Sequence, residues 1–145
     1  MGWQRARTPE AYRLSPPSLP LRCPVTEPRV GWNTGARTDI RVALAQLNTV
    51  VGDIDGNADR ITAALGEAAD AGADVTLVPE LAITGYPPED LLLRPAFAAA
   101  ARAAVDRVAS TVTTGPAIIG FPDGKGDWHN AAAGVADGRV QALYH

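Results

Sequence analysis

Residues 39–80 read DIRVALAQLNTVVGDIDGNADRITAALGEAADAGADVTLVPE and decide the fold class. Over 40–47, large apolar positions alternate with small or polar ones, which is the period-2 pattern of a β-strand. Apolar residues then recur at helical spacing between Asn57, which can cap a helix, and Gly72. The β-branched run 74–79 ends in proline, as a short buried strand can. The order strand, helix, strand predicts a crossover unit of an α/β fold.

The remaining sequence extends this α/β pattern. The loop after the second strand is apolar but contains glycine and two prolines, which exclude a long regular element. The last apolar alternation still runs at the C-terminus, so we expect the fold to continue beyond this chain. A mixed sheet with two helices on one face is therefore predicted. Its later elements are a loop at 80–90, a helix from Pro95 to about Val112, and strands at 117–121, 128–135 and 139–145, the last two joined by a turn at Asp137-Gly138.

Composition is that of a soluble globular domain. The 145 residues are 46% hydrophobic and 20% charged, with a formal net charge of −3. Every apolar run is shorter than the roughly 18 residues of a membrane-spanning helix, and residues 1–13 lack the apolar core of a signal peptide. The single cysteine, Cys23, fits a reducing compartment. We therefore expect a cytoplasmic protein.

Charge and proline content divide the chain at residue 38. Residues 1–38 hold six prolines and six arginines against two glutamates, a charge of +4. Residues 39–145 hold seven basic and fourteen acidic side chains, a charge of −7. The first segment is predicted to be a disordered extension, or to precede the true start of the protein. The acidic body argues against nucleic acid as its partner.

The familiar metal and nucleotide motifs are absent from the sequence. The acidic run 53–59 has the alternating spacing of a calcium loop, but Ala58 replaces its glycine and Ala64 replaces its final glutamate. No GxxxxGK[ST] or GxGxxG phosphate loop occurs. His129 and His145 have no partners at metal-ligand spacing. No metal site is predicted.

Glu80 is the candidate catalytic residue. It directly follows a predicted buried strand, so its carboxylate emerges at the carboxyl edge of the sheet, where open α/β folds place catalytic groups. A carboxylate there can act as a general base. The residues alone also allow a solvated glutamate at the end of a strand.

Longer motifs surround Glu80. Residues 78–81 read VPEL, and residues 84–92 read TGYPPEDLL. They resemble the glutaminase domain of the glutamine-dependent NAD synthetases, a branch of the nitrilase or carbon–nitrogen hydrolase superfamily. Residues 42–48 and 129–132 resemble other strands of that domain, and the resemblance covers about 39–145. The PEL step is shared by nitrilases generally, whereas TGYPPEDLL indicates the NAD synthetase branch.

The resemblance implies the N-terminal part of an α-β-β-α sandwich with a Glu-Lys-Cys triad. Glu80 matches the glutamate of that triad. The family's lysine lies just after the strand that ends at Tyr144-His145, and its cysteine lies further along, so both are expected beyond this chain. The fragment alone is then expected to be inactive. Tyr86, on the same loop as Glu80, is a candidate wall of the substrate pocket, with simple packing under the loop as the alternative.

The resemblance also implies partners and cofactors. L-Glutamine is the expected substrate, and the ammonia released from it is used to amidate nicotinic acid adenine dinucleotide in NAD biosynthesis. The glutaminase half needs no cofactor, whereas ATP and Mg2+ are expected in a synthetase domain absent from this chain. A homo-oligomer is expected, with no nucleic-acid or membrane partner. Two alternatives remain open: an amidase acting on a small amide or carbamoyl compound, and a non-catalytic α/β interaction module.

Overall fold

The computed structural model describes residues 39–124 and 127–145. Residues 1–38, for which the sequence predicts an extension, lie outside this range. None of the described helices is long and apolar enough to cross a membrane. The elements in chain order are β1 (Val42–Leu44), α1 (Ile54–Asp70), β2 (Val75–Leu77), the short 3-10 helix η1 (Glu89–Leu93), α2 (Pro95–Ala109), β3 (Ala117–Gly124), β4 (Trp128–Ala136) and β5 (Arg139–Tyr144).

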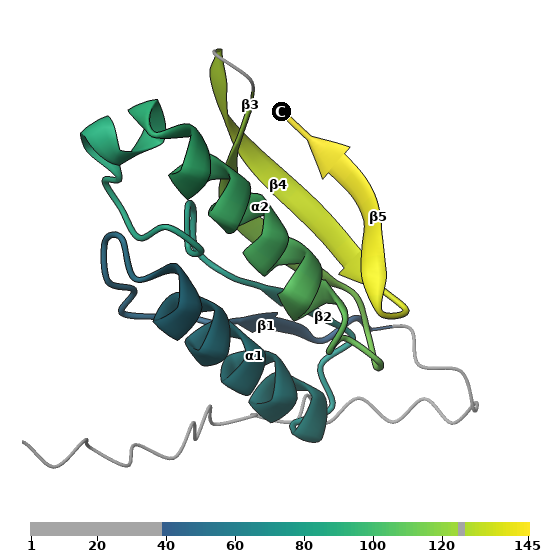
Figure 1. Cartoon of the computed structure of the whole chain (residues 1–145). Helices are drawn as coiled ribbons and strands as arrows, with labels where there is room; N and C mark the ends of the chain where they lie inside the picture. Colours follow the sequence, from purple (N-terminus) through teal and green to yellow (C-terminus); the bar gives the residue numbers. More distant parts are fainter. Residues whose placement is uncertain (1–38, 125–126) are drawn as a thin grey trace, which may run out of the picture. The chain divides into compact units, whose positions relative to one another are not determined.

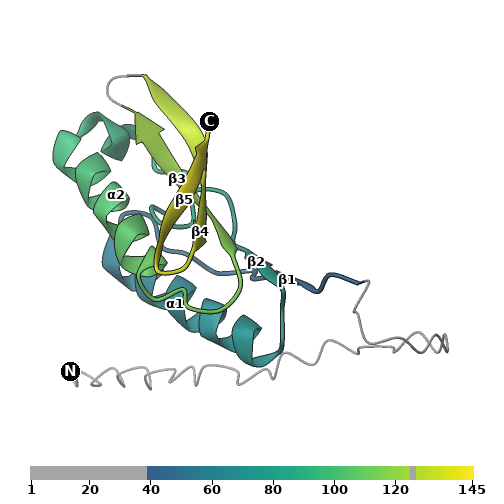
Figure 2. The same cartoon turned by 90° about the vertical axis from the view of Figure 1, so that its right-hand side faces the viewer.

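The strands form one mixed sheet in the order β1-β2-β3-β4-β5. The first three strands are parallel and are connected through α1 and α2, whereas β3, β4 and β5 pair antiparallel. Figures 1 and 2 show both helices on the same side of the sheet. Two successive crossovers of the same hand place their helices on one face, so this arrangement follows from the topology. The predicted mixed sheet with two helices on one face is confirmed.

The hydrophobic core lies between the helices and this face of the sheet. On β4, alternate residues from Ala131 onward are buried toward the helices, and on β3 the residues Ala117, Ile119 and Phe121 are buried on the same side. Alanines on α2 and β4 keep the two layers close together. The largest buried side chains are Phe121, Ile61, Ile83, Ile119, Val105, Val108 and Val135.

Among the described residues, no helix covers the opposite face of the sheet, which is apolar. Leu44 on β1 is 75% exposed, Ile118 on β3 is 40% exposed and Tyr144 on β5 is 78% exposed. The pairing of Leu44 with Leu77, and of Leu77 with Ile118, places these side chains in one row across three strands. We call this surface the open face. An apolar sheet face is normally covered by another layer, and a second sheet, as in the sandwich implied by the resemblance, would cover it.

The start of α1 differs from the sequence prediction. The helix begins at Ile54 with Asp53 as its N-cap, and the Asp53 Oδ1 atom accepts a hydrogen bond from the backbone N–H of Gly56 at 3.0 Å. Asn57, predicted as the cap, lies inside the first turn and is fully buried. Aspartate and asparagine both cap helices well. Asp53 is the cap here because the Asn57 side chain is buried between two loops and bonds to them instead.

The strands and α2 also differ in length from the predicted ranges. The β1 strand spans three residues instead of 40–47, because its one neighbour, β2, offers only three residues for pairing. The α2 helix ends at Ala109, earlier than Val112, and β3 continues through Pro122 to Gly124. The hairpin turn was predicted correctly, since Asp137 and Gly138 both have positive φ, of 52° and 72°, as a type I′ turn requires.

Neighbouring isoleucines on β3 provide a matched test of the two faces. Ile119 is fully buried against the helices, so Ile119→Ala should lower the free energy of unfolding by about 2–5 kcal/mol. Ile118 points to the open face, and Ile118→Ala should cost about 1 kcal/mol or less. Urea unfolding of both variants of this 145-residue chain, in which Ile118 is exposed, measures the difference. Equal costs would contradict the assignment of the two faces.

Candidate active site

Glu80 lies in the turn that follows β2, at the carboxyl edge of the parallel strands. Its side chain is exposed, and its Oε1 atom accepts a hydrogen bond of 2.6 Å from the Nδ2 atom of Asn130 on β4. Among the described residues, no arginine or histidine forms an ion pair with this carboxylate. The position predicted from the sequence is therefore confirmed, and the site offers an accessible carboxylate held by a neutral amide.

Gly120 on β3 has no side chain, so the backbone around Glu80 can lie in close contact with β3. A Cβ atom at position 120 would lie 2.6 Å from the Pro79 carbonyl oxygen and 2.9 Å from the Glu80 Cα atom. Such distances are far inside van der Waals contact. The N–H of Ile83 also donates to the Gly120 carbonyl, at 3.5 Å. The turn that carries Glu80 thus rests directly on the backbone of β3.

Asn57 fixes the other side of this turn. Its Oδ1 atom accepts from the Val50 N–H at 2.8 Å, while its Nδ2 atom donates to the carbonyls of Val50 at 2.8 Å and Ile83 at 3.1 Å. The amide therefore joins the loop before α1 to the loop after β2. Gly85 completes the contact, since a Cβ atom there would lie 2.6 Å from the Val51 nitrogen. Sequence patterns could not predict this role of Asn57, because both loops contribute only backbone atoms.

Leu81, which follows Glu80, has a left-handed backbone conformation with φ of 48°. Residues other than glycine rarely adopt such angles, and they persist where surrounding structure enforces them. The Leu81 side chain is buried, and its carbonyl accepts hydrogen bonds from both the N–H and the hydroxyl of Thr84. These contacts hold the sharp turn at the point where Glu80 leaves the sheet.

Tyr86 lies on the same loop, after Gly85, and is 66% exposed. Within the described residues it therefore does not pack under the loop, which was the alternative from sequence. Among the described residues, no hydrogen bond joins Tyr86 to Glu80. Its place in a substrate pocket stays a prediction.

Histidine and carboxylate side chains gather near the end of β5. The Nε2 atom of His145 lies 3.0 Å from the Oδ2 atom of Asp123, which also pairs with Arg102 at 3.5 Å. The rings of His145 and His129 meet edge to face at 5.3 Å between centroids. Among residues 39–124 and 127–145, no group of three or more His, Cys, Asp or Glu side chains is arranged to hold a metal ion.

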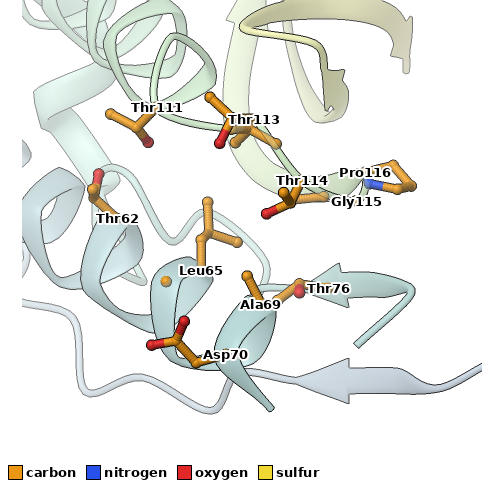
Figure 3. A pocket seen from close by; sticks show the side chains of 13 residues that line it. Thr62, Leu65, Ala69, Asp70, Thr76, Thr111, Thr113, Thr114, Gly115 and Pro116 are labelled. Carbon is orange, nitrogen blue, oxygen red and sulfur yellow. The ribbon is translucent and has the colours of Figure 1, made fainter. Parts of the chain in front are cut away.

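A hollow of about 330 Å³ lies elsewhere, at the end of the sheet where β3 begins. Figure 3 shows the Leu65 side chain pointing from α1 toward the segment that carries Thr113 and Thr114. The hollow is rich in threonine hydroxyls and includes one carboxylate, Asp70. Glu80 does not line it, and it lacks an acid–base pair, so it is not the candidate active site.

Gly120 and Gly134 provide a matched pair of substitutions on the open face. Gly120→Ala should lower the free energy of unfolding by about 1–3 kcal/mol, because the new methyl group collides with the turn at Glu80. Gly134→Ala should change it by only about 0.5 kcal/mol, since the nearest atom to its Cβ, on Ala142, is 3.8 Å away. Thermal and urea unfolding measure both. A neutral Gly120→Ala would show that the close approach is not required.

Asn57→Leu should destabilise the protein by about 3 kcal/mol or more. The substitution leaves the Ile83 carbonyl and the Val50 N–H without their partner, at about 1–3 kcal/mol each, and removes one of the two hydrogen bonds to the Val50 carbonyl. Asn48→Leu, at an exposed asparagine before the same loop, is the control and should be nearly neutral. Similar unfolding midpoints for the two variants would contradict the bridging role of Asn57.

Comparison with known proteins identifies the family. A carbon-nitrogen hydrolase family model matches residues 41–136. Glutamine-dependent NAD(+) synthetases from Xylella fastidiosa and Thermotoga maritima are 44% and 43% identical to this chain over 107 residues, which cover 72% of the chain and 20% and 19% of the relatives. The chain thus spans about a fifth of the length of these curated relatives.

Solved structures give the same result. A glutamine-dependent NAD(+) synthetase from Cytophaga hutchinsonii superposes with a TM-score of 0.68 at 31% identity, covering 72% of this chain and 18% of that one. An amidase from Nesterenkonia sp. superposes with a TM-score of 0.63 at 27% identity, covering 73% of this chain and 42% of that one. With the family model matching well over half of its residues, this chain belongs to the carbon–nitrogen hydrolase family.

Proposed function

We propose that this chain is the N-terminal part of the glutaminase domain of a glutamine-hydrolysing NAD+ synthetase and supplies Glu80 as its general base. The observation that carries the proposal is the position of Glu80: it is an accessible carboxylate at the carboxyl edge of the parallel strands, inside the VPEL motif on which the resemblance rests. The names and the 43–44% identity of the curated relatives support the choice of branch within the family.

The proposed reaction is hydrolysis of the L-glutamine carboxamide in two steps. A cysteine thiol from a later part of the polypeptide gives its proton to Glu80 and attacks the carboxamide carbon, while a lysine stabilises the oxyanion. Glu80 returns the proton to the leaving ammonia, and a thioester remains. Water, activated by Glu80, then attacks the thioester and releases glutamate and the thiol. A single carboxylate can serve both steps because it is regenerated after each proton transfer.

The register of β4 and β5 supports this assignment. Ala132 pairs with Tyr144 in antiparallel register, so continued pairing would place the residue after His145 opposite Asn130. Directly paired side chains lie on the same face, about 5 Å apart at their Cβ atoms. The lysine that the resemblance predicts just after His145 would then stand beside Asn130, the residue that contacts Glu80.

The remaining features of the proposal concern the whole enzyme. The glutaminase half would use no cofactor, and ATP with Mg2+ would act in the synthetase domain, where ammonia amidates nicotinic acid adenine dinucleotide. A homo-oligomer and a cytoplasmic location complete the proposal. The relatives' names, which describe glutamine-dependent synthesis of NAD, support the need for such a second domain.

A stand-alone amidase acting on a small amide or carbamoyl compound is the second candidate. The structural similarity to the Nesterenkonia amidase favours it, because this chain covers 42% of that protein. The same Glu80 chemistry would apply, without a synthetase domain. The two candidates differ in their products: only the synthetase consumes ATP and forms NAD+, with glutamine as the nitrogen source. A non-catalytic α/β module is the third candidate and predicts no turnover of any amide.

Glu80→Gln in the longer protein that contains this segment tests the general base. Glutamine-driven NAD+ formation should fall by about 10²–10⁴-fold, which is the typical contribution of a general base, whereas synthesis from free ammonia should be retained. Coupled NAD+ assays with each nitrogen source measure the two activities. Glu67→Gln, at an exposed carboxylate on α1, is the control and should leave both unchanged.

Different outcomes separate the candidates. Normal glutamine turnover by the Glu80→Gln variant would contradict the role of Glu80. Amide hydrolysis without any ATP-dependent NAD+ formation in the unsubstituted protein would favour the small-amide enzyme. Absence of both activities would favour the non-catalytic module.

A further inference from the structure

The contact between Glu80 and Asn130 joins two segments that are 50 residues apart in the chain. Glu80 follows β2, Asn130 lies on β4, and β3 runs between these strands in the sheet. The backbone of Glu80 can lie directly against β3 because Gly120 has no side chain; a Cβ atom there would lie 2.9 Å from the Glu80 Cα atom. Three separate segments therefore combine to bring one amide to one carboxylate.

Packing in the hydrophobic core does not account for an asparagine at position 130. Its neighbour Ala131 is buried on the helix side of β4, as are Ala133 and Val135, so the alternation directs Asn130 toward the open face. Asn130 is exposed there. Its side chain makes one hydrogen bond in the described part of the chain, and that bond goes to Glu80.

We propose that Asn130 is a positioning residue for the general base: its amide anchors the Oε1 atom of Glu80, so that Oε2 is the oxygen that exchanges the proton. Within the described residues, Oε1 is the carboxylate oxygen that has a hydrogen-bond partner. A neutral amide fixes the direction of the carboxylate without adding a counter-charge beside it. This inference rests on the proposed function and adds to it the residue that orients the base.

Orientation matters because the rate of proton transfer depends steeply on the distance and angle between the donor and acceptor atoms. An exposed glutamate side chain with three rotatable bonds otherwise samples many rotamers, and few of them direct an oxygen toward the reacting thiol. A displacement of about 1 Å can cost on the order of 100-fold in rate. The anchor should thus affect the chemical step and leave glutamine binding largely unchanged.

The test uses Asn130→Ala and Asn130→Asp in the full-length enzyme that contains this chain. Both variants should lower kcat for glutamine-driven NAD+ formation by about 10–100-fold, with KM for glutamine within about twofold of the unsubstituted value. Asn130→Asp keeps the shape but removes the donor, so it should be at least as slow as Asn130→Ala. Asn130→Gln keeps an amide donor and should recover part of the rate. Synthesis from free ammonia should remain unchanged in all three variants.

Controls separate positioning from a general structural effect. Gln141→Ala removes another exposed amide, on β5, that donates to the Ala136 carbonyl instead of Glu80, and it should leave kcat unchanged. Thermal unfolding midpoints of the Asn130 variants should match those of Gln141→Ala. In the Glu80→Gln background, Asn130→Ala should cause no further loss, because Asn130 is proposed to act through Glu80.

Two results would overturn the inference while leaving the proposed function intact. One is an Asn130→Ala variant with unchanged kcat, in an enzyme that Glu80→Gln inactivates. The other is a rise in KM at unchanged kcat, which would make Asn130 a glutamine-binding residue. Normal glutamine turnover by Glu80→Gln would instead overturn the proposed function, and the positioning role with it.

Discussion

The buried amide of Asn57 is the interaction on which the site geometry depends. It satisfies backbone groups of Val50 and Ile83, which belong to the loops that follow β1 and β2. Buried backbone groups without partners are costly, so neither loop can move away from α1 without losing hydrogen bonds. The first turn of a helix thereby becomes the fixed point to which both loops at the carboxyl edge of the sheet are attached.

Two glycines extend this constraint to the turn at Glu80. Gly85 brings the loop after β2 against the backbone of Val51, and Gly120 brings the turn at Glu80 against β3. At each place a Cβ atom would come within 2.6 Å of a backbone atom, so any larger residue would push the layers apart. These backbone contacts fix the turn but not the exposed Glu80 side chain, whose hydrogen bond goes to Asn130.

The sequence predicted the elements better than the contacts. Periodicity revealed both helices and all five strands because it reflects which face of each element is buried. The strand-end position of Glu80 followed from the same reasoning. Asn57 was misassigned as a cap, since its partners at Val50 and Ile83 are close only in the folded chain. Asn130 was similarly missed as a partner of Glu80, because local patterns carry no information about residues so far apart.

The separation between Glu80 and Asn130 has a consequence for synthesis on the ribosome. Glu80 is translated 50 residues before Asn130, and Gly120, on which the backbone of Glu80 rests, is translated between them. A nascent chain that has produced only the first crossover therefore presents an unrestrained glutamate, and the carboxylate acquires its orientation only when the antiparallel hairpin emerges. The orientation of this one side chain is therefore set late in synthesis, when β4 is added to the sheet.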